Sequence, residues 1–425
     1  MNEREQNFTV SDLNAFRIKM LNWVNRFSIF CLLDNRQYDL ETAAFECMLG
    51  AGSKESITCV AGNAFETLKQ FHDKKKTWLM GHLGYGLKNE NEKLVSAHPD
   101  NIGFKDLQFF IPEILIRLKK DVIAISCSDP ERIFEEINNF IPAADLQQTK
   151  IKIQKRISQD EYEAVIKKLQ QHILRGDCYE INFCQEFFAE DIVIDPVMIY
   201  KRLTDFSPNP FSSLYRQDDK YCICASPERY LKKSGDHLFS QPIKGTSRRD
   251  LKDSIKDEAA KTYLLQSAKE KSENVMVVDL VRNDLSRVCT EGTVKVDELF
   301  GLYSFPQVHQ LISTVSGRLR NDLHFVDAIK ATFPMGSMTG APKKRVMELI
   351  EQYEKTARGL FSGAIGYISP DGDFDFNVVI RSIFYNADKK YLSFQTGGAI
   401  TFYSDTAEEY EECLLKAESI MKILE

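Results

Sequence analysis

The stretch Ser240-Gln241-Pro242-Ile243-Lys244-Gly245-Thr246 predicts a short turn that carries a lysine. Pro242 fixes the backbone on one side of Lys244, and Gly245 frees it on the other side. Residues 230–233 and 238–239 are typical of a hairpin that leads into this turn. Such a hairpin brings Glu228 and Lys244 into one pocket, the first as a candidate acid and the second as a candidate nucleophile. From these residues alone, two solvated charges at loop edges are the more frequent outcome.

The composition indicates a globular chain with a large core. The chain has 425 residues, of which 43% are hydrophobic, and its net charge is −7. No basic block is present, so we expect no nucleic-acid surface, although a local site for an anionic small molecule stays compatible with an acidic protein. Residues 1–6 are polar and lack the apolar core of a signal peptide, and no apolar run is long enough to span a bilayer. We therefore expect a cytoplasmic protein that contacts no membrane.

The cysteines and histidines give no sign of a metal site or of disulfide bonds. Ten cysteines are scattered without a CxxC motif, which indicates free thiols in a reducing compartment. Cys222 and Cys224 are two positions apart in an apolar run, so both should point to the same face of a strand and pack as small hydrophobic residues. The seven histidines show no ligand spacing, so a zinc site is not expected.

The first part of the chain predicts an antiparallel α+β arrangement. Buried-strand candidates at residues 27–33, 57–62, 79–86 and 122–127 do not alternate regularly with helices, which argues against a doubly wound sheet. Residues 140–157 are polar and form the best internal boundary, between an N-terminal region at 1–150 and a second region at 155–425. The next helix begins at Ser158, which forms a capping box with Glu161.

A helical stretch follows from about residue 257 to residue 288. Apolar residues occur on nearly all of its sides, which indicates a buried helix, and a strand over residues 275–281 is the alternative. Burial of Glu273, Asp279 and Arg282 is costly unless each is paired or bound to a ligand. This cost favours a functional role for the stretch.

Residues 333–345 form a glycine-rich loop that leads into a helix. Pro342 suits the first helical position, free amides at a helix start attract anions, and three basic residues follow. An ordinary loop and cap is the alternative. Strands at 364–369 and 376–382 form a predicted hairpin, and a third strand at 392–396 ends in Gly397-Gly398-Ala399. Arg381 lies in the second of these strands, either in a core or interface ion pair or as a fork for a carboxylate.

The last helix begins at Asp405 or Thr406 and has a continuous apolar stripe. Glu409, Glu412 and Lys416 form a second line beside this stripe. A solvated face is the usual explanation. Carboxylates three positions apart on a helix can also share a hard cation, and with Glu273 from another helix they could build an oxygen-only magnesium site.

Together these fragments match one known pattern, because the chain resembles the chorismate-utilising enzymes. The resemblance is greatest with the branch that aminates chorismate to 4-amino-4-deoxychorismate for para-aminobenzoate and folate synthesis. It covers residues from about 155 to 420 in order, and more loosely the first 150 residues. The shared motifs are Gly176-Asp177-Cys178-Tyr179, Ser226-Pro227-Glu228-Arg229, Pro242-Ile243-Lys244-Gly245-Thr246, Glu273-Asn274, Asp279-Leu280-Val281-Arg282-Asn283-Asp284, Gly340-Ala341-Pro342, Ile380-Arg381-Ser382, Gly397-Gly398-Ala399 and residues 409–416.

The resemblance implies a fold, a cofactor and a set of site residues. The fold would be a large α+β body in which antiparallel sheets pack as a sandwich surrounded by helices, with both regions in one compact unit. Magnesium would be bound by Glu273 and Glu412, with Glu409 nearby. The resemblance assigns catalysis to Lys244, Glu228, His309 and Thr246, although His309 could instead be a buried polar spacer in an apolar strand. Substrate binding would involve Arg381, Lys416, Gly340, Ala341, Gly397, Gly398, Ala399 and Tyr367.

Two positions separate the reactions of this family. Members that make anthranilate typically carry alanine at the position of Lys244. Members that make isochorismate or salicylate carry a lysine base at the position of Glu180, where most members of the aminating branch have glutamine. The resemblance therefore gives Glu180 no role.

The expected reaction begins with attack of neutral Lys244 on ring carbon C2 of chorismate. Glu228 would protonate the departing C4 hydroxyl, and ammonia from a separate class I glutamine amidotransferase subunit would then enter at C4. We expect a lowered pKa for Lys244, from burial and neighbouring cations, and a raised pKa for Glu228. The alternatives are anthranilate synthase component I and a non-catalytic chorismate-binding subunit.

Overall fold

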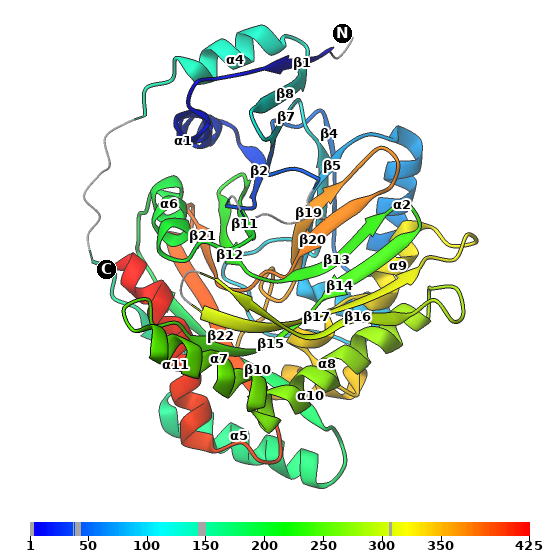
Figure 1. Ribbon diagram of the computed structural model, residues 1–425, viewed down its shortest axis with the longest axis vertical. Helices are drawn as coiled ribbons and strands as arrows, with labels where there is room; N and C mark the ends of the chain where they lie inside the picture. Colours follow the sequence, from blue (N-terminus) through cyan, green and yellow to red (C-terminus); the bar gives the residue numbers. More distant parts are fainter. Residues whose placement is uncertain (1–3, 37, 39–43, 143–149, 306–307) are drawn as a thin grey trace.

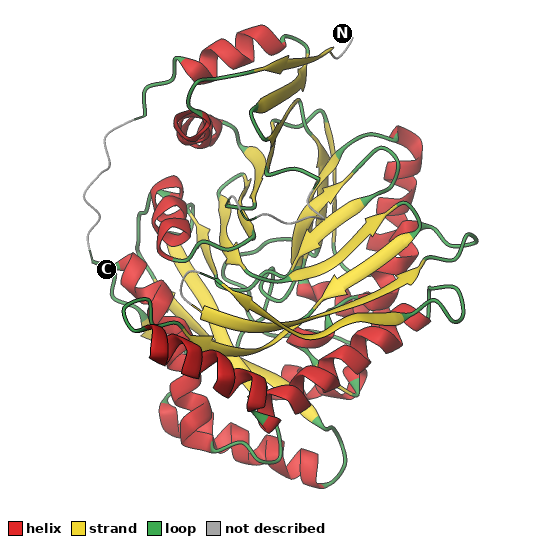
Figure 2. Cartoon of the chain, viewed as in Figure 1, coloured by secondary structure: helices red, strands yellow, loops and turns green. Residues whose placement is uncertain are grey.

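The chain folds as two large antiparallel β-sheets with helices around them (Figure 1, Figure 2). The structure is a computed structural model and describes residues 4–36, 38, 44–142, 150–305 and 308–425. Every pair of neighbouring strands among these residues is antiparallel, so the predicted α+β class is confirmed. The predicted boundary at 140–157 falls partly on residues 143–149, which lie outside the described residues.

The first sheet has twelve strands in the described part of the chain, in the order β1-β8-β7-β3-β2-β11-β12-β21-β22-β10-β18, and β9 also pairs with β10. In chain order these strands are β1 (Arg4–Phe8), β2 (Ile29–Asp34), β3 (Cys47–Ala51), β7 (Ile114–Lys119), β8 (Val122–Cys127), β9 (Gln154–Lys155), β10 (Glu180–Ala189), β11 (Phe211–Gln217), β12 (Lys220–Ser226), β18 (Gly340–Ala341), β21 (Ser382–Asn386) and β22 (Tyr391–Ile400).

The second sheet has ten strands within the same residues, in the order β15-β17-β14-β13-β20-β19-β5-β6-β4, and β16 also pairs with β17. In chain order these strands are β4 (Glu55–Cys59), β5 (Leu79–Leu83), β6 (Leu107–Ile111), β13 (Arg229–Ser234), β14 (His237–Gln241), β15 (Ile243–Arg248), β16 (Lys295–Ser304), β17 (Val308–Arg318), β19 (Ala364–Ile368) and β20 (Phe374–Asn377).

The helices lie outside the two sheets (Figure 2). The α-helices are α1 (Leu13–Trp23), α2 (Ala64–Lys75), α3 (Lys88–Glu92), α4 (Pro130–Asn138), α5 (Gln159–Leu174), α6 (Pro196–Phe206), α7 (Ser254–Gln266), α8 (Ala268–Ser286), α9 (Phe325–Thr332), α10 (Lys343–Tyr353) and α11 (Thr406–Leu424). The described residues also form three short 3-10 helices, η1 (Val24–Arg26), η2 (Tyr85–Leu87) and η3 (Gly336–Met338). The capping box of Ser158 and Glu161 at the start of α5 is confirmed.

Both sheets combine strands from the two regions of the chain. In the first sheet Leu32 of β2 pairs with Leu214 of β11. In the second sheet Gly81 of β5 pairs with Gly366 of β19. The first 150 residues and the rest of the chain therefore share the same two sheets.

Alternating side chains build one core on each face of the first sheet. Cys222 and Cys224 of β12 are fully buried in the core that also contains the second sheet, as their spacing predicted. Ile223, between them, is buried in the other core, beneath helices such as α1, α5 and α11. Because successive side chains of a strand point to opposite faces of the sheet, the first sheet packs against the second sheet on one face and against helices on the other.

Two predicted elements are each divided in the structure. The helical stretch at 257–288 is two helices, because Ser267 ends α7 and its side chain caps α8 by accepting a hydrogen bond from the Glu270 amide. The strand alternative for residues 275–281 is wrong. The predicted strand at 376–382 ends at Asn377 in the second sheet, and β21 begins at Ser382 in the first sheet. Arg381 lies in the link and takes a φ of +50°, which turns the chain from one sheet to the other.

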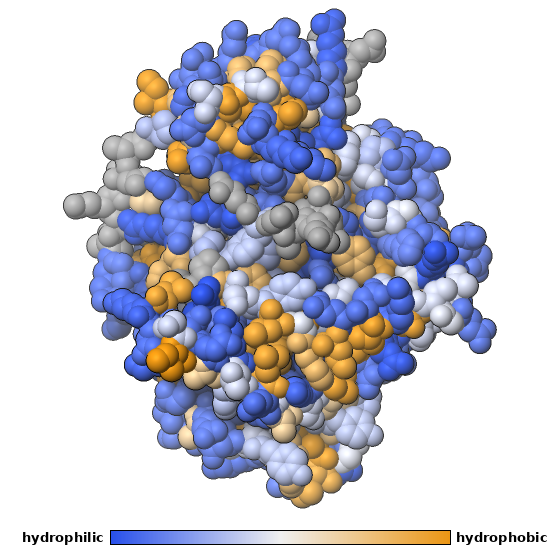
Figure 3. All heavy atoms as spheres, viewed as in Figure 1, coloured by the Kyte–Doolittle hydropathy of each residue, from blue (hydrophilic) through white to orange (hydrophobic). Residues whose placement is uncertain are grey.

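The surface is mostly hydrophilic on the face shown in Figure 3, with hydrophobic side chains gathered over α8 and the neighbouring strands. Val275 of α8 and Leu299 of β16 are 40% and 48% exposed. In the described part of the chain, no helix combines the length and the apolar character that crossing a membrane requires.

Candidate active site

Lys244 lies on a strand and not in the predicted turn. The pairing of β15 with β17 shifts between Ile243 and Thr246, so that Lys244 and Gly245 form a bulge. Gly245 takes a φ of +95°, which favours glycine. The bulge directs the Lys244 side chain, which is 12% exposed, to Glu180 at the start of β10. Strands β10, β15 and β22 and helices α8 and α11 meet here, in the lower half of Figure 1.

Asn274 of α8 holds the bulge by buried hydrogen bonds. Its Nδ2 donates to the carbonyl oxygens of Lys244 at 3.2 Å and Leu311 at 3.4 Å. Its Oδ1 accepts a hydrogen bond of 2.6 Å from the Ser313 hydroxyl. An amide in this position satisfies backbone groups that a bulge leaves without a ladder partner. The sequence placed Asn274 in a motif beside Glu273 but did not reveal this positioning role.

Lys244 and Glu180 form a buried ion pair. Lys244 Nζ lies 2.8 Å from Glu180 Oε1, and the Glu180 side chain is 4% exposed. Glu180 Oε2 is also buried and has no hydrogen-bond partner among the described residues. Burial lowers the pKa of Lys244, but the carboxylates of Glu180, Glu273 and Glu228 outweigh it and raise the pKa above its ordinary value.

The expectation of a lowered pKa for Lys244 is therefore wrong for the chain without ligands. Carboxylates, and not cations, surround the ammonium group. An opposite charge stabilises the protonated form, so Lys244 is held as a cation until a proton acceptor or a ligand changes its surroundings.

Glu228 has the raised pKa expected of a general acid at neutral pH. It follows β12, is 4% exposed, and its amide donates to the Ser226 hydroxyl at 3.2 Å. Burial raises the pKa of its carboxyl to about 7, although the charges of Lys244 and Arg381 act in the opposite direction. The mutual effect of Glu228 and Lys244 places both groups in one electrostatic environment, as the hairpin predicted.

Arg381 offers an unpaired guanidinium beside this acid. Its guanidinium forms no hydrogen bond or salt bridge with another residue that the structure describes, and burial lowers its pKa while Glu228 raises it. The predicted core ion pair is thus not formed. An unpaired guanidinium matches the planar carboxylate of a ligand.

Glu273, Glu409 and Glu412 form an acidic group around Lys269, and the charge of Lys244 interacts with Glu273 and Glu412. Glu273 Oε1 is buried and has no hydrogen-bond partner among the described residues, and burial raises the pKa of this carboxyl to about 7. Glu409 Oε1 accepts a hydrogen bond of 2.8 Å from the Ser404 hydroxyl and lies 3.6 Å from Lys269 Nζ. Burial raises the pKa of Glu409, while Lys416 at 2.7 Å lowers that of Glu412.

The chemistry of the acidic group fits magnesium. Glu273 is the buried carboxylate of the group that lacks a described partner, which is costly, and a hard cation that prefers oxygen ligands and keeps several waters would offset that cost. In the described part of the chain, however, the only three ligand atoms of His, Cys, Asp or Glu within 4.8 Å of one another belong to His72, Asp73 and His324. The three glutamates are therefore a loose set here, which suits a cation that also takes ligands from water and substrate.

The glycines predicted to bind substrate differ in which atoms a Cβ at each position would meet. A Cβ at Gly340 would lie 2.1 Å from the carbonyl oxygen of Glu180, and one at Gly397 would lie 1.9 Å from that of Phe183. Both glycines therefore permit close strand pairing with β10. A Cβ at Gly398 would instead lie 2.9 Å from Glu409 Oε2, so this glycine leaves the acidic group open.

The other predicted binding residues lie on the same strands. Lys416 Nζ donates to the Gly397 carbonyl at 2.8 Å. Ala341 pairs with Glu180 and Ala399 pairs with Asn182. The backbone of this region thus borders the Glu180–Lys244 pair.

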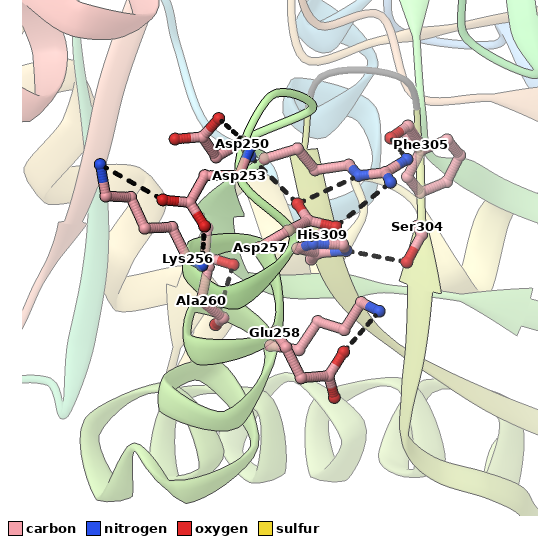
Figure 4. A network of polar contacts seen from close by, with 12 residues as sticks. Asp250, Asp253, Lys256, Asp257, Glu258, Ala260, Ser304, Phe305 and His309 are labelled. Atoms are coloured by element: carbon pink, nitrogen blue, oxygen red, sulfur yellow. Dashed lines mark hydrogen bonds and ion pairs between the residues drawn. The ribbon is translucent and has the colours of Figure 1, made fainter.

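His309 points to Asp257 of α7 (Figure 4). It is fully buried on β17, with Nε2 3.0 Å from Asp257 Oδ1 and Nδ1 2.8 Å from the Ser304 hydroxyl. Hydrogen bonds from Arg249 and His309 lower the pKa of Asp257 to about 2. Both ring nitrogens of His309 are engaged, so its catalytic role stays a prediction, as does that of Thr246, an exposed residue whose Oγ1 accepts a hydrogen bond of 3.4 Å from Gln310.

Tyr367 lines a different cavity. It lies with Asp34, Asn35 and Arg229 around a cavity of about 70 Å³, and its ring is packed 6.0 Å from that of Phe45. Its predicted contact with substrate finds no support in this placement.

Two predicted features are structural. Asp279 and Arg282 are exposed and pair with each other at 2.9 Å, so only Glu273 of the three charged residues is buried as expected. Lys343, one of the three basic residues after the glycine-rich loop, pairs with buried Asp284 at 2.5 Å. This pair joins α10 to α8, and Lys343 is not available to an anion.

Comparison with known proteins identifies the family. The profile of the family described as chorismate binding enzyme matches residues 26–422. The chain is 34% identical to the aminodeoxychorismate synthase component 1 of Escherichia coli strain K12, with 81% of this chain and 76% of that protein covered. It is also 34% identical to an anthranilate synthase component I-like protein of Synechocystis, with 82% and 72% covered.

Solved structures agree with this result. The anthranilate synthase component I of Streptococcus pneumoniae is similar with a TM-score of 0.78 and 27% identity, over 90% of this chain and 93% of that chain. The menaquinone-specific isochorismate synthase of Escherichia coli shares the fold, with a TM-score of 0.80 at 15% identity, over 100% of this chain and 94% of that chain. The chain belongs to the chorismate binding enzyme family.

Proposed function

We propose that the chain converts chorismate and ammonia to 4-amino-4-deoxychorismate. The observation that carries this proposal is that Lys244, 12% exposed, shares one electrostatic environment with Glu228, and burial raises the pKa of Glu228 to about 7. A lysine can serve as a nucleophile, and a carboxyl group that is half protonated near neutral pH can serve as a general acid. The relatives named aminodeoxychorismate synthase component 1 support this choice.

In the proposed first step, the Lys244 nitrogen forms a bond with ring carbon C2. Electrons shift through the ring, the C4–O bond breaks, and Glu228 gives its proton to the oxygen, which leaves as water. In the second step ammonia bonds to C4, the C2–N bond breaks, and Glu228 recovers a proton from the incoming nitrogen. The sum is chorismate plus ammonia to 4-amino-4-deoxychorismate plus water.

Glu180 is the proposed proton acceptor for Lys244. The two groups are 2.8 Å apart, which is within the range for direct proton transfer. The second oxygen, Oε2, has no other described partner and can hold the proton that the lysine nitrogen releases. Glu180 would return this proton when Lys244 leaves C2.

Substrate carboxylates would be held by Arg381 and Lys416, together with backbone groups near Gly398. Glu273, Glu409 and Glu412 are the residues that would hold magnesium. When bound, magnesium would supply positive charge for a substrate carboxylate and offset the negative charge that raises the pKa of Lys244.

Ammonia would come from a separate class I glutamine amidotransferase subunit. The resemblance to the aminating branch and the word component in the names of the relatives support this part of the proposal.

Anthranilate synthesis is the second candidate, because similar proteins and structures carry that name. Product analysis by liquid chromatography and mass spectrometry, with chorismate, magnesium and ammonium, separates the two. We expect 4-amino-4-deoxychorismate. Formation of fluorescent anthranilate from chorismate would overturn the proposal, and absence of any turnover would favour a non-catalytic chorismate-binding subunit.

A further inference from the structure

Two histidines and an aspartate meet between α2 and α9, which lie side by side at the right of Figure 1. His72 and Asp73 are in the last turn of α2, and His324 is the residue that caps α9. One ligand atom from each lies within 4.8 Å of the others. His324 is far in the sequence from the neighbouring His72 and Asp73, so no local spacing indicates the group.

His72 has the tautomer and orientation of a metal ligand. Its Nε2 lies 3.1 Å from the Ser369 carbonyl oxygen, which can only accept, so Nε2 carries the proton and Nδ1 has a free lone pair. His72 is 5% exposed, and its Nδ1 is buried without a hydrogen-bond partner among the described residues. In metal-binding histidines, a backbone carbonyl commonly accepts from one ring nitrogen and so leaves the other nitrogen to bind the metal.

His324 and Asp73 complete the group from the solvent side. His324 Nε2 lies 3.3 Å from Asp73 Oδ1, and these side chains are 18% and 54% exposed. His324 Nδ1 accepts a hydrogen bond of 3.2 Å from the Val326 amide. Metal binding at Nε2 would move the ring proton to Nδ1, so the ring would have to turn from this amide. The Asp327 carboxylate, which accepts from the His324 amide at 2.9 Å, would still hold the start of α9.

We propose that His72, Asp73 and His324 bind a divalent transition metal ion such as Zn²⁺, with water in the remaining position. Two imidazoles and one carboxylate are ligands that such ions prefer, whereas magnesium prefers oxygen alone. The bound ion would tie α2, from the first region of the chain, to α9, from the second region. This site is separate from the acidic group near Lys244.

A Zn²⁺ titration of the full chain tests the proposal. The chain is first freed of metal with a chelator, and its Zn²⁺ affinity is then measured by competition with a chromophoric chelator. We expect one Zn²⁺ site that weakens about tenfold or more in His72→Gln and in His324→Asn. Asparagine is a good helix cap, so His324→Asn removes a ligand and retains the start of α9. The matched control is His237→Gln, because His237 is an exposed histidine 3.5 Å from Asp236 and should not affect the site.

Circular dichroism and chorismate turnover would show that each variant is folded. Co²⁺ bound to the native chain should show absorption typical of nitrogen and oxygen ligands, without the bands of thiolate ligands. The proposal is overturned if the native chain binds no Zn²⁺, or if His72→Gln and His324→Asn bind it as tightly as the native chain and the His237→Gln control do.

Discussion

Replacement of Glu180 by glutamine tests how the chain controls the charge of Lys244. The substitution keeps the shape of the side chain and removes the charge that lies 2.8 Å from Lys244 Nζ. A carboxylate at this distance stabilises the protonated lysine, so its removal should lower the pKa of Lys244 by roughly 1–3 pH units, or about 1.4–4 kcal/mol. At a fixed pH below both pKa values, the neutral fraction of Lys244 would rise roughly 10- to 1,000-fold.

Competitive acylation of lysines across a pH series, read by mass spectrometry of the Lys244 peptide, measures this change directly. Lys232 is the internal control, because it is 8% exposed and its partner Asp375, at 3.6 Å, is unchanged by the substitution. We expect the acylation curve of Lys244 to move to lower pH in Glu180→Gln while the curve of Lys232 stays in place. An unchanged curve for Lys244, or one displaced to higher pH, would refute the account of the ion pair.

Three further substitutions test other parts of the site. Glu228→Gln should lower turnover by a factor of about 10²–10⁴ and retain chorismate binding. Turnover of the native chain should fall as Glu228 loses its proton above about pH 7. Turnover of the variant equal to that of the native chain would exclude Glu228 as the general acid. In buffer without divalent ions, the native chain should lose about 3 kcal/mol of stability as the pH rises from about 4.5 to 7, because burial raises the folded pKa of Glu273 to about 7 and the unfolded chain loses this proton first. Glu273→Gln should abolish this pH dependence, and denaturant unfolding at several pH values measures it. Gly397→Ala should destabilise the chain by about 1–3 kcal/mol, because its Cβ would lie 1.9 Å from the Phe183 carbonyl oxygen. The Cβ of Gly398→Ala would meet the side chain of Glu409 instead, so this variant should lose less stability and should alter the magnesium dependence of turnover. Equal denaturation midpoints for the two variants would contradict this assignment.

The sequence predicted those parts of the site that local patterns determine. The hairpin before Lys244 follows from alternating residues and a turn, and in the structure the charges of Glu228 and Lys244 act on each other. The burial of Glu273 follows from the apolar residues around it on α8. The capping box of α5 follows from two residues three positions apart.

The features of the site that the sequence did not predict depend on contacts between distant segments of the chain. The pKa of Lys244 is raised because Glu180, on another sheet, faces it, and no local pattern shows this pair. The apolar residues around His309 predict that it is buried in a strand. Its contact with Asp257 depends on how α7 packs on β17, which the sequence does not show. Arg381 was placed inside a strand because its neighbours are apolar, although the chain changes sheet at that residue.

Mass spectrometry of the intact chain after incubation with chorismate and magnesium, without ammonia, tests the central claim most directly. We expect a covalent adduct on Lys244 with the mass of chorismate less water. Addition of ammonium should release the adduct as 4-amino-4-deoxychorismate. The Lys244→Ala variant should form neither adduct nor product, and formation of 4-amino-4-deoxychorismate by this variant at the native rate would contradict the account.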